Sequence, residues 1–100
     1  MRQYEGLLHD KLAKVVTELQ KQGDKIYLER RQAQGLSFKK GSSDCYIVYN
    51  GQHYEIEEKQ PDGERTVMQE KWEAKCRRLG IPYILARTVE EVFDEIKKDK

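Results

Sequence analysis

The chain has 100 residues, which is enough for one domain, and we treat residues 1–100 as a single unit. Charged and apolar residues each make up 37% of it, and the apolar residues are patterned rather than scattered, which excludes a disordered tail. A formal net charge of +1 excludes nucleic-acid binding by bulk charge alone. It leaves open a local basic patch or a bound cation.

The first half of the chain opens with a predicted helix over residues 3–22, because apolar residues recur there at spacings of three and four. Gly23 is a natural stop for it. Glu5 lies on the same stripe as Leu12, nearly two turns earlier, so its carboxylate is expected on the core side of the first turn. The stripe consists of Leu8, Leu12, Val15, Val16 and Leu19.

The centre of the chain carries the strongest local pattern. Residues 44–49 and 52–59 are β-prone runs separated by Asn50-Gly51, which is typical of a tight hairpin because both turn positions need positive φ. Before them, residues 26–29 are a short strand candidate, and the polar residues 30–43 are interpreted as a loop or irregular strand.

A second helix is predicted over residues 66–79, where Thr66 and Gln69 have the spacing of a capping box. An apolar strand over residues 82–86 and a last helix opening at Thr88 follow. The second helix is expected to bury a stripe formed by Met68, Trp72, Cys76 and Leu79.

The predicted order is therefore α-β-β-β-α-β-α, an α/β fold in which a mixed sheet is flanked by helices. The two cysteines, Cys45 and Cys76, are too few for a disulfide framework and lack metal-ligand spacing, so we expect both to be buried and reduced. No stretch approaches the roughly 20 apolar residues of a membrane span, and the chain does not open with an apolar signal region. We expect a cytoplasmic protein.

The hairpin register places chemistry on one face. Counting from Asn50-Gly51, Asp44 lies opposite Glu57, and directly opposed residues have Cβ atoms roughly 4.5–5.5 Å apart. Lys59, two residues past Glu57, shares that face. Opposed like charges are destabilising unless one carboxyl has a raised pKa or a hard cation such as Mg²⁺ or Mn²⁺ binds both. The backbone carbonyl of Glu58 is a candidate third ligand.

Simpler interpretations of these residues exist. An aspartate at the start of a strand is often a turn residue, and Glu-x-Lys on a strand is often an exposed, weak ion pair. The hairpin alone therefore indicates a metal site without requiring one.

The arrangement resembles the PD-(D/E)xK nucleases, and within them the VRR-NUC domain, the virus-type replication-repair nuclease. The resemblance rests on Gly41-Ser42-Ser43-Asp44, Glu57-Glu58-Lys59, Gln69 and the strand that follows Gly80. It implies a restriction-endonuclease-like core and phosphodiester hydrolysis with a divalent metal. With the N-terminal helix, it covers nearly the whole chain.

Carried over residue by residue, the resemblance implies that Asp44 and Glu57 are metal carboxylates and that Lys59 is the catalytic lysine. Gln69 would position the site, and Glu5 would be a further metal or water contact. Two positions depart from the family. Ser43 replaces the usual proline and Glu58 replaces an apolar residue, which makes Glu58 a rival ligand.

Basic residues cluster in pairs that could contact phosphates, although a solvated face is the simpler interpretation. The candidate nucleic-acid contacts are Arg30, Arg31, Lys39, Lys40 and Arg77.

The sequence thus predicts a Mg²⁺- or Mn²⁺-dependent endonuclease that acts on DNA, and the size suggests a phage-type enzyme of replication, recombination or repair working in the host cytoplasm. One site on so small a domain covers few base pairs, so we expect a homodimer acting on branched DNA such as a four-way junction. Two alternatives stay open, a non-catalytic nucleic-acid-binding module and an RNA-directed nuclease of the same fold.

Overall fold

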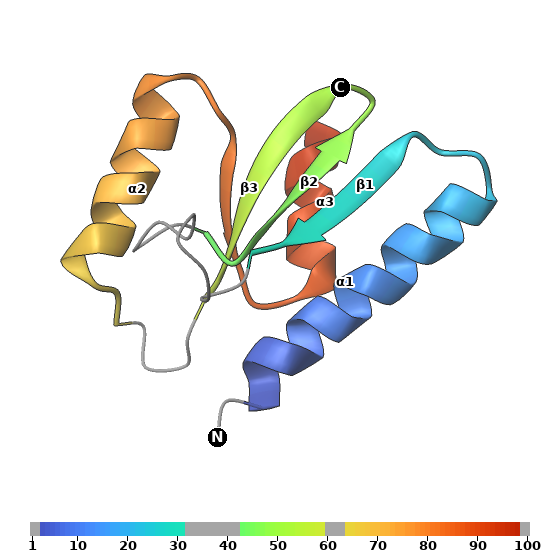
Figure 1. The fold of residues 1–100 in the computed structure, drawn as a ribbon, viewed down its shortest axis with the longest axis horizontal. Coiled ribbons are helices and arrows are strands. Elements are labelled where there is room, and N and C mark those ends of the chain that lie inside the picture. The colour runs from blue at the N-terminus through green and yellow to red at the C-terminus, as the bar shows by residue number, and fades with distance from the viewer. Residues whose placement is uncertain (1–2, 32–42, 60–63, 99–100) are drawn as a thin grey trace.

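The computed structural model describes residues 3–31, 43–59 and 64–98 (Figure 1). Within these ranges, side chains are described from Leu8 onward. The predicted order of elements is confirmed. Among the described residues, no helix combines the length and apolar character that a bilayer span requires. In chain order the elements are α1 (Gln3–Lys21), β1 (Ile26–Arg30), β2 (Cys45–Tyr49), β3 (Gln52–Glu58), α2 (Val67–Arg78), β4 (Tyr83–Ala86) and α3 (Val89–Lys98).

The four strands form one mixed sheet in the order β1-β2-β3-β4 (Figure 1). β2 pairs antiparallel with both β1 and β3, whereas β3 and β4 are parallel neighbours joined through α2. Parallel neighbours need a crossover, and α2 supplies it. The sequence-based expectation of a mixed sheet flanked by helices is confirmed, and β3, α2 and β4 form a β-α-β unit.

The hydrophobic core lies between one face of the sheet and the pair α1 and α3. The alternation of side chains along β2 and β3 sends every second residue into it, and Ile47, Val92 and Ile96 are completely buried. The cluster consists of Leu8, Leu12, Val16, Ile26, Cys45, Ile47, Tyr54, Ile56, Ile84, Ala86, Val92 and Ile96. The apolar stripe predicted for the first helix therefore packs in this core, together with the apolar face of α3.

The hairpin forms as predicted. Asn50 and Gly51 have φ of 51° and 84°, the positive values that a tight hairpin turn requires. Tyr49 pairs with Gln52 and the ladder continues to Cys45 opposite Ile56. The first strand of the hairpin, β2, starts at Cys45, one residue later than expected, so Asp44 lies in a bend just before it.

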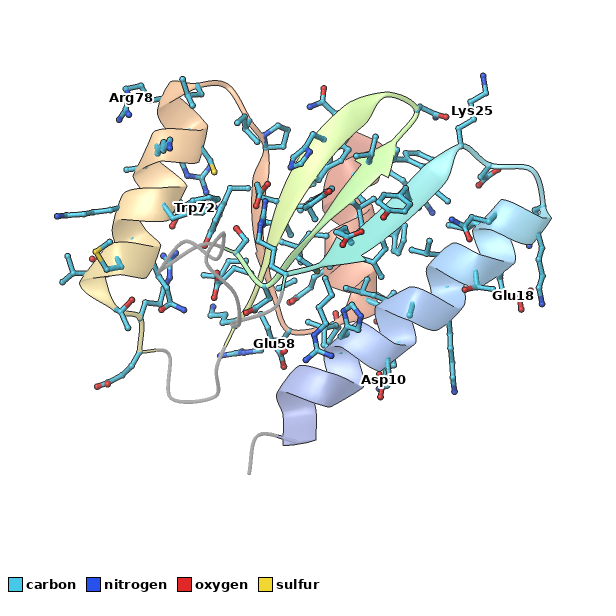
Figure 2. All side chains as sticks on the ribbon, in the orientation of Figure 1. Asp10, Glu18, Lys25, Glu58, Trp72 and Arg78 are labelled. Atoms are coloured by element: carbon cyan, nitrogen blue, oxygen red, sulfur yellow. The ribbon has the colours of Figure 1, made fainter. Side chains whose placement is uncertain are left out.

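The other face of the sheet lies under α2, and here one expectation is wrong. Met68 is 39% exposed and Leu79 60% exposed, so only Trp72 and Cys76 of the predicted stripe turn inward. Figure 2 shows Trp72 lying between α2 and the sheet. The reason is that this sheet face carries the charged or hydroxyl-bearing side chains of Glu55, Glu57 and Tyr83, so α2 meets it largely with polar groups.

Both cysteines are free and buried, as expected. Burial raises the pKa of Cys45 to about 12, with the nearby Asp44 charge acting in the same direction. The thiol therefore stays protonated and packs as a small apolar group.

Candidate active site

The site is centred on Glu57, near the end of β3. Its side chain is 3% exposed, although it carries a carboxylate. Gln69 Nε2 donates to Glu57 Oε2 at 3.0 Å, and the Tyr83 hydroxyl donates to Oε1 at 3.4 Å. Both carboxylate oxygens are thus fixed by donors from two other elements, which is how a buried charged group is tolerated and oriented.

Gln69 serves the two roles that the sequence left open. Its Oε1 accepts the Thr66 backbone N–H at 2.8 Å, while its own N–H donates to Thr66 Oγ1 at 3.0 Å, which completes a capping box. The amide nitrogen remains for Glu57. One side chain therefore ties the start of α2 to the buried carboxylate of β3.

A pair of substitutions separates these roles. Gln69→Glu keeps an acceptor for the cap but replaces the donor to Glu57 with a second carboxylate, so we expect the free energy of unfolding to fall by about 1–3 kcal/mol more than a cap substitution alone. Thr66→Ala removes only the cap and should cost about 1 kcal/mol. Urea unfolding at neutral pH without added metal measures both. Equal losses would show that the contact with Glu57 contributes nothing.

Asp44 lies opposite Glu57 if the observed register is continued by one pair. Its Oδ2 accepts the backbone N–H of Glu58 at 2.7 Å, and its carbonyl accepts the N–H of Arg31 at 2.9 Å. The side chain of Asp44 therefore continues the hydrogen bonding between the two hairpin strands one residue before β2 begins. The hydrogen bond from this backbone N–H stabilises the Asp44 carboxylate and offsets part of its repulsion from Glu57.

Lys59 follows β3 directly and stays paired to β4 through its N–H, which donates to the carbonyl of Ala86 at 2.8 Å. Its exposed side chain lines a hollow of about 30 Å³ together with Glu57, Arg65 and Gln69. The structure thus brings Lys59, Glu57 and Gln69 to one place, as predicted. The Glu58 side chain is buried and also borders a larger groove toward α1.

Two members of this constellation were missed by the sequence analysis. Arg65 Nη2 donates to the Tyr83 hydroxyl at 2.9 Å, and its Nη1 pairs with Glu73 at 2.7 Å. Burial, reinforced by the Glu57 charge, raises the pKa of Tyr83 and keeps its hydroxyl a donor. Tyr83 lies in the strand predicted over residues 82–86, but nothing in the sequence indicates its contact with Glu57 or that of Arg65 with Tyr83.

A second buried carboxylate, Glu55, shares the face of Glu57 and was also missed. Arg31 binds it through both guanidinium nitrogens, Nη1 to Oε1 at 2.6 Å and Nη2 to Oε2 at 2.9 Å, and His53 contacts Oε2. The guanidinium lies 5.0 Å from the ring centroid of Tyr46 and 5.5 Å from that of Trp72. The two-residue period that placed Glu57 on this face also places Glu55 there.

The basic residues predicted to contact phosphates differ in their surroundings. Arg31 is committed to Glu55, and Arg77 donates from Nε and Nη2 to Glu73 at 2.8 and 2.6 Å. Arg30 is exposed at the end of β1. Lys39 and Lys40 lie outside the described residues.

The described residues offer few ligands for the predicted metal ion. Within residues 3–31, 43–59 and 64–98, the structure holds no group of three or more His, Cys, Asp or Glu side chains placed to bind a metal. The side chain of Glu5 lies outside the described residues, although its backbone is in the first turn of α1. Asp44 and Glu57 remain, with the carbonyl of Glu58. Mg²⁺ binds through one or two carboxylates and completes its shell with waters and substrate phosphates, so this donor set fits it.

Searches for similar proteins returned no matching family model, no matching curated protein and no matching solved structure.

Proposed function

We propose that this protein is a metal-dependent nuclease of the VRR-NUC type that hydrolyses phosphodiester bonds in DNA. One observation carries the proposal. Glu57 is a buried carboxylate with both oxygens held, two residues before an exposed lysine that lines the same hollow. Fixed carboxylates beside a cation are what a metal-assisted attack on a phosphate requires.

In this proposal, each side chain of the site has one role in the reaction. Asp44 and Glu57 hold the divalent cation, with the Glu58 carbonyl as third ligand and Glu5 as a further contact from α1. When bound, the cation polarises a phosphoryl oxygen and lowers the pKa of a water. Lys59 balances the negative charge that builds on the phosphate as water attacks phosphorus and the bond to the leaving sugar oxygen breaks.

Gln69 and Tyr83 fix the orientation of Glu57 through one hydrogen bond to each carboxylate oxygen. Arg65 holds the Tyr83 hydroxyl in turn. These three are positioning residues, since none needs to touch the substrate.

Calorimetric titration with Mn²⁺ tests the site directly. The parent protein should bind Mn²⁺, whereas Asp44→Asn and Glu57→Gln should bind at least about ten-fold more weakly, because each loses a charged ligand. Glu18→Gln, at the far end of α1 (Figure 2), is the matched control and should bind like the parent. If the parent binds no Mn²⁺, a non-catalytic nucleic-acid-binding module replaces the nuclease.

The proposal includes branched DNA as substrate and a homodimer as the working form, because two symmetric cuts call for two symmetry-related sites. Light scattering at working concentration checks the assembly, and a monomeric mass would contradict it. Cleavage of RNA but not DNA by the same site would turn the assignment into an RNA-directed nuclease.

A further inference from the structure

A groove of about 840 Å³ opens beside the candidate site, between α1 and the start of α3. Figure 2 shows Glu58, which borders it, at the end of the sheet nearest the first half of α1. The groove is far larger than the hollow at Glu57, which holds about 30 Å³. The tasks proposed for Asp44, Glu57 and Lys59 do not use it.

Positive charge gathers on the walls of this groove. Two lysines of α1, Lys11 and Lys14, lie one turn apart on the same side, and Lys59 and Arg87 face them from the strand ends. None of these four forms an ion pair with another residue in the described part of the chain. The whole chain has a net charge of only +1, so the groove gathers a large share of cationic side chains on one surface.

The acidic groups that face the groove do not cancel this charge. Glu58 and Glu90 line it, and the charge of Glu91 interacts with those of Arg87 and Lys59, so four cationic side chains stand against three carboxylates. The α3 N-terminus adds backbone N–H groups, although Glu91 already accepts those of Arg87 and Thr88. The groove as a whole keeps an excess of positive charge and is suited to an anion.

Between the charged walls the groove has an apolar lining. Leu8 is buried, and Val15 and Val89 are half-buried with their remaining surface turned into the groove. Pockets of roughly 300–1,000 Å³ hold ligands of small-molecule size, a class that matches a short piece of one strand rather than a duplex. A single nucleic-acid strand offers both surfaces, repeated phosphates for the cations and base faces for the apolar lining.

The groove and the candidate site share two lining residues. Glu58 and Lys59 border both the groove and the small hollow that contains Glu57. A strand whose phosphate lies at Lys59 therefore reaches the groove with its neighbouring nucleotides.

We propose that this groove binds a single strand of nucleic acid next to the phosphate at Glu57 and Lys59. It selects substrates with an unpaired segment at a branch or a frayed end over uninterrupted duplex. The choice of ligand rests on the proposed function, whereas the binding itself is measured without cleavage.

The test is fluorescence anisotropy with a labelled oligothymidine strand and a duplex of equal length, titrated with salt in EDTA so that nothing is cut. The variant is the triple Lys11→Gln/Lys14→Gln/Arg87→Gln, which leaves Lys59 intact. For single strands the slope of log K against log salt is about 0.7 per phosphate contact, so loss of three contacts should reduce it by about 2. Affinity at low salt should fall at least about ten-fold.

The matched control is the triple Lys21→Gln/Lys25→Gln/Lys97→Gln, which removes the same charge from exposed positions that do not line the groove. Lys25 is at the opposite end of the sheet from Glu58 (Figure 2). The control should keep the parent slope. Equal losses of affinity and salt slope in the two triple variants would overturn the proposal that the groove binds the strand. If the parent protein binds the duplex as tightly as the single strand, the proposed selectivity is wrong.

Cleavage with Mn²⁺ separates this proposal from the nuclease assignment. A parent that cuts DNA, with a groove variant that binds and cuts equally well, keeps the nuclease and removes the groove. A parent that binds the strand through the groove residues but never cuts keeps the groove and removes the nuclease.

Discussion

Lys59→Ala is expected to lower the rate of metal-dependent DNA cleavage by about 10²–10³-fold, the range measured when one group that stabilises transition-state charge is removed. Lys59 is exposed and makes no side-chain contact on which the fold depends within the described residues, and its backbone pairing to Ala86 does not need the side chain. The loss should therefore appear in the chemical step rather than in stability. Single-turnover cleavage of a branched DNA at saturating protein measures it.

Lys59 also borders the groove, so binding and chemistry must be separated. Saturating protein removes the binding contribution, and Lys25→Ala provides a control of equal charge change at an exposed position away from the site. Lys25→Ala should cut at the parent rate. Parent-like single-turnover cleavage by Lys59→Ala would remove the lysine from the mechanism, even if Glu57 still binds the cation.

The sequence predicted the fold well where one short-range rule dominated. Asn50-Gly51 specified the turn, the turn specified the register, and the register placed Asp44 opposite Glu57. The helices that pack on the core face were equally predictable, because their apolar spacing matches their burial. These inferences need no knowledge of the rest of the chain.

The polar face of the sheet was predictable only in part. Period-two alternation places Glu55 beside Glu57, but only the tertiary structure brings Arg31, 24 residues earlier in the chain, onto Glu55. Arg65 and Tyr83 likewise meet Glu57 through the packing of α2 on β4. The apolar stripe predicted for α2 wrongly included Met68 and Leu79 for the same reason, since the sequence does not show that α2 packs on charged groups.

Arg31→Met is expected to be the most destabilising substitution on this face. It leaves Glu55, whose side chain is 5% exposed, without its bidentate partner, and uncompensated buried charges of this kind cost about 3–5 kcal/mol. The Arg31 side chain is 23% exposed, so we expect the lower end, about 3 kcal/mol. For a domain of this size that lowers Tm by about 12–24 °C.

The pH dependence of stability identifies the cause. Burial acts to raise the pKa of Glu55, but hydrogen bonds from Arg31 and His53 outweigh it and hold the pKa below its usual 4.5. A group with a lowered folded-state pKa contributes stability above its unfolded pKa and loses it as the pH falls through the folded value. The parent should therefore lose this contribution in acid, below about pH 4.5.

Arg31→Met weakens that dependence, because the largest opposing contact is lost, burial is then opposed mainly by the His53 contact, and the pKa of Glu55 rises. The variant should be weakest relative to the parent at neutral pH and should approach it as Glu55 protonates. Arg31→Met/Glu55→Leu, which removes both charges, should regain most of the lost stability, since well-packed apolar pairs often replace buried ion pairs without loss.

Arg77→Met is the matched control for the arginine substitution. Arg77 also pairs with a carboxylate, but its side chain is 61% exposed, and such pairs contribute at most about 1 kcal/mol. Thermal unfolding of the four proteins at several pH values compares them directly. If Arg31→Met unfolds like Arg77→Met at neutral pH, the pair with Glu55 is not a structural anchor, and Arg31 becomes available again as a phosphate contact.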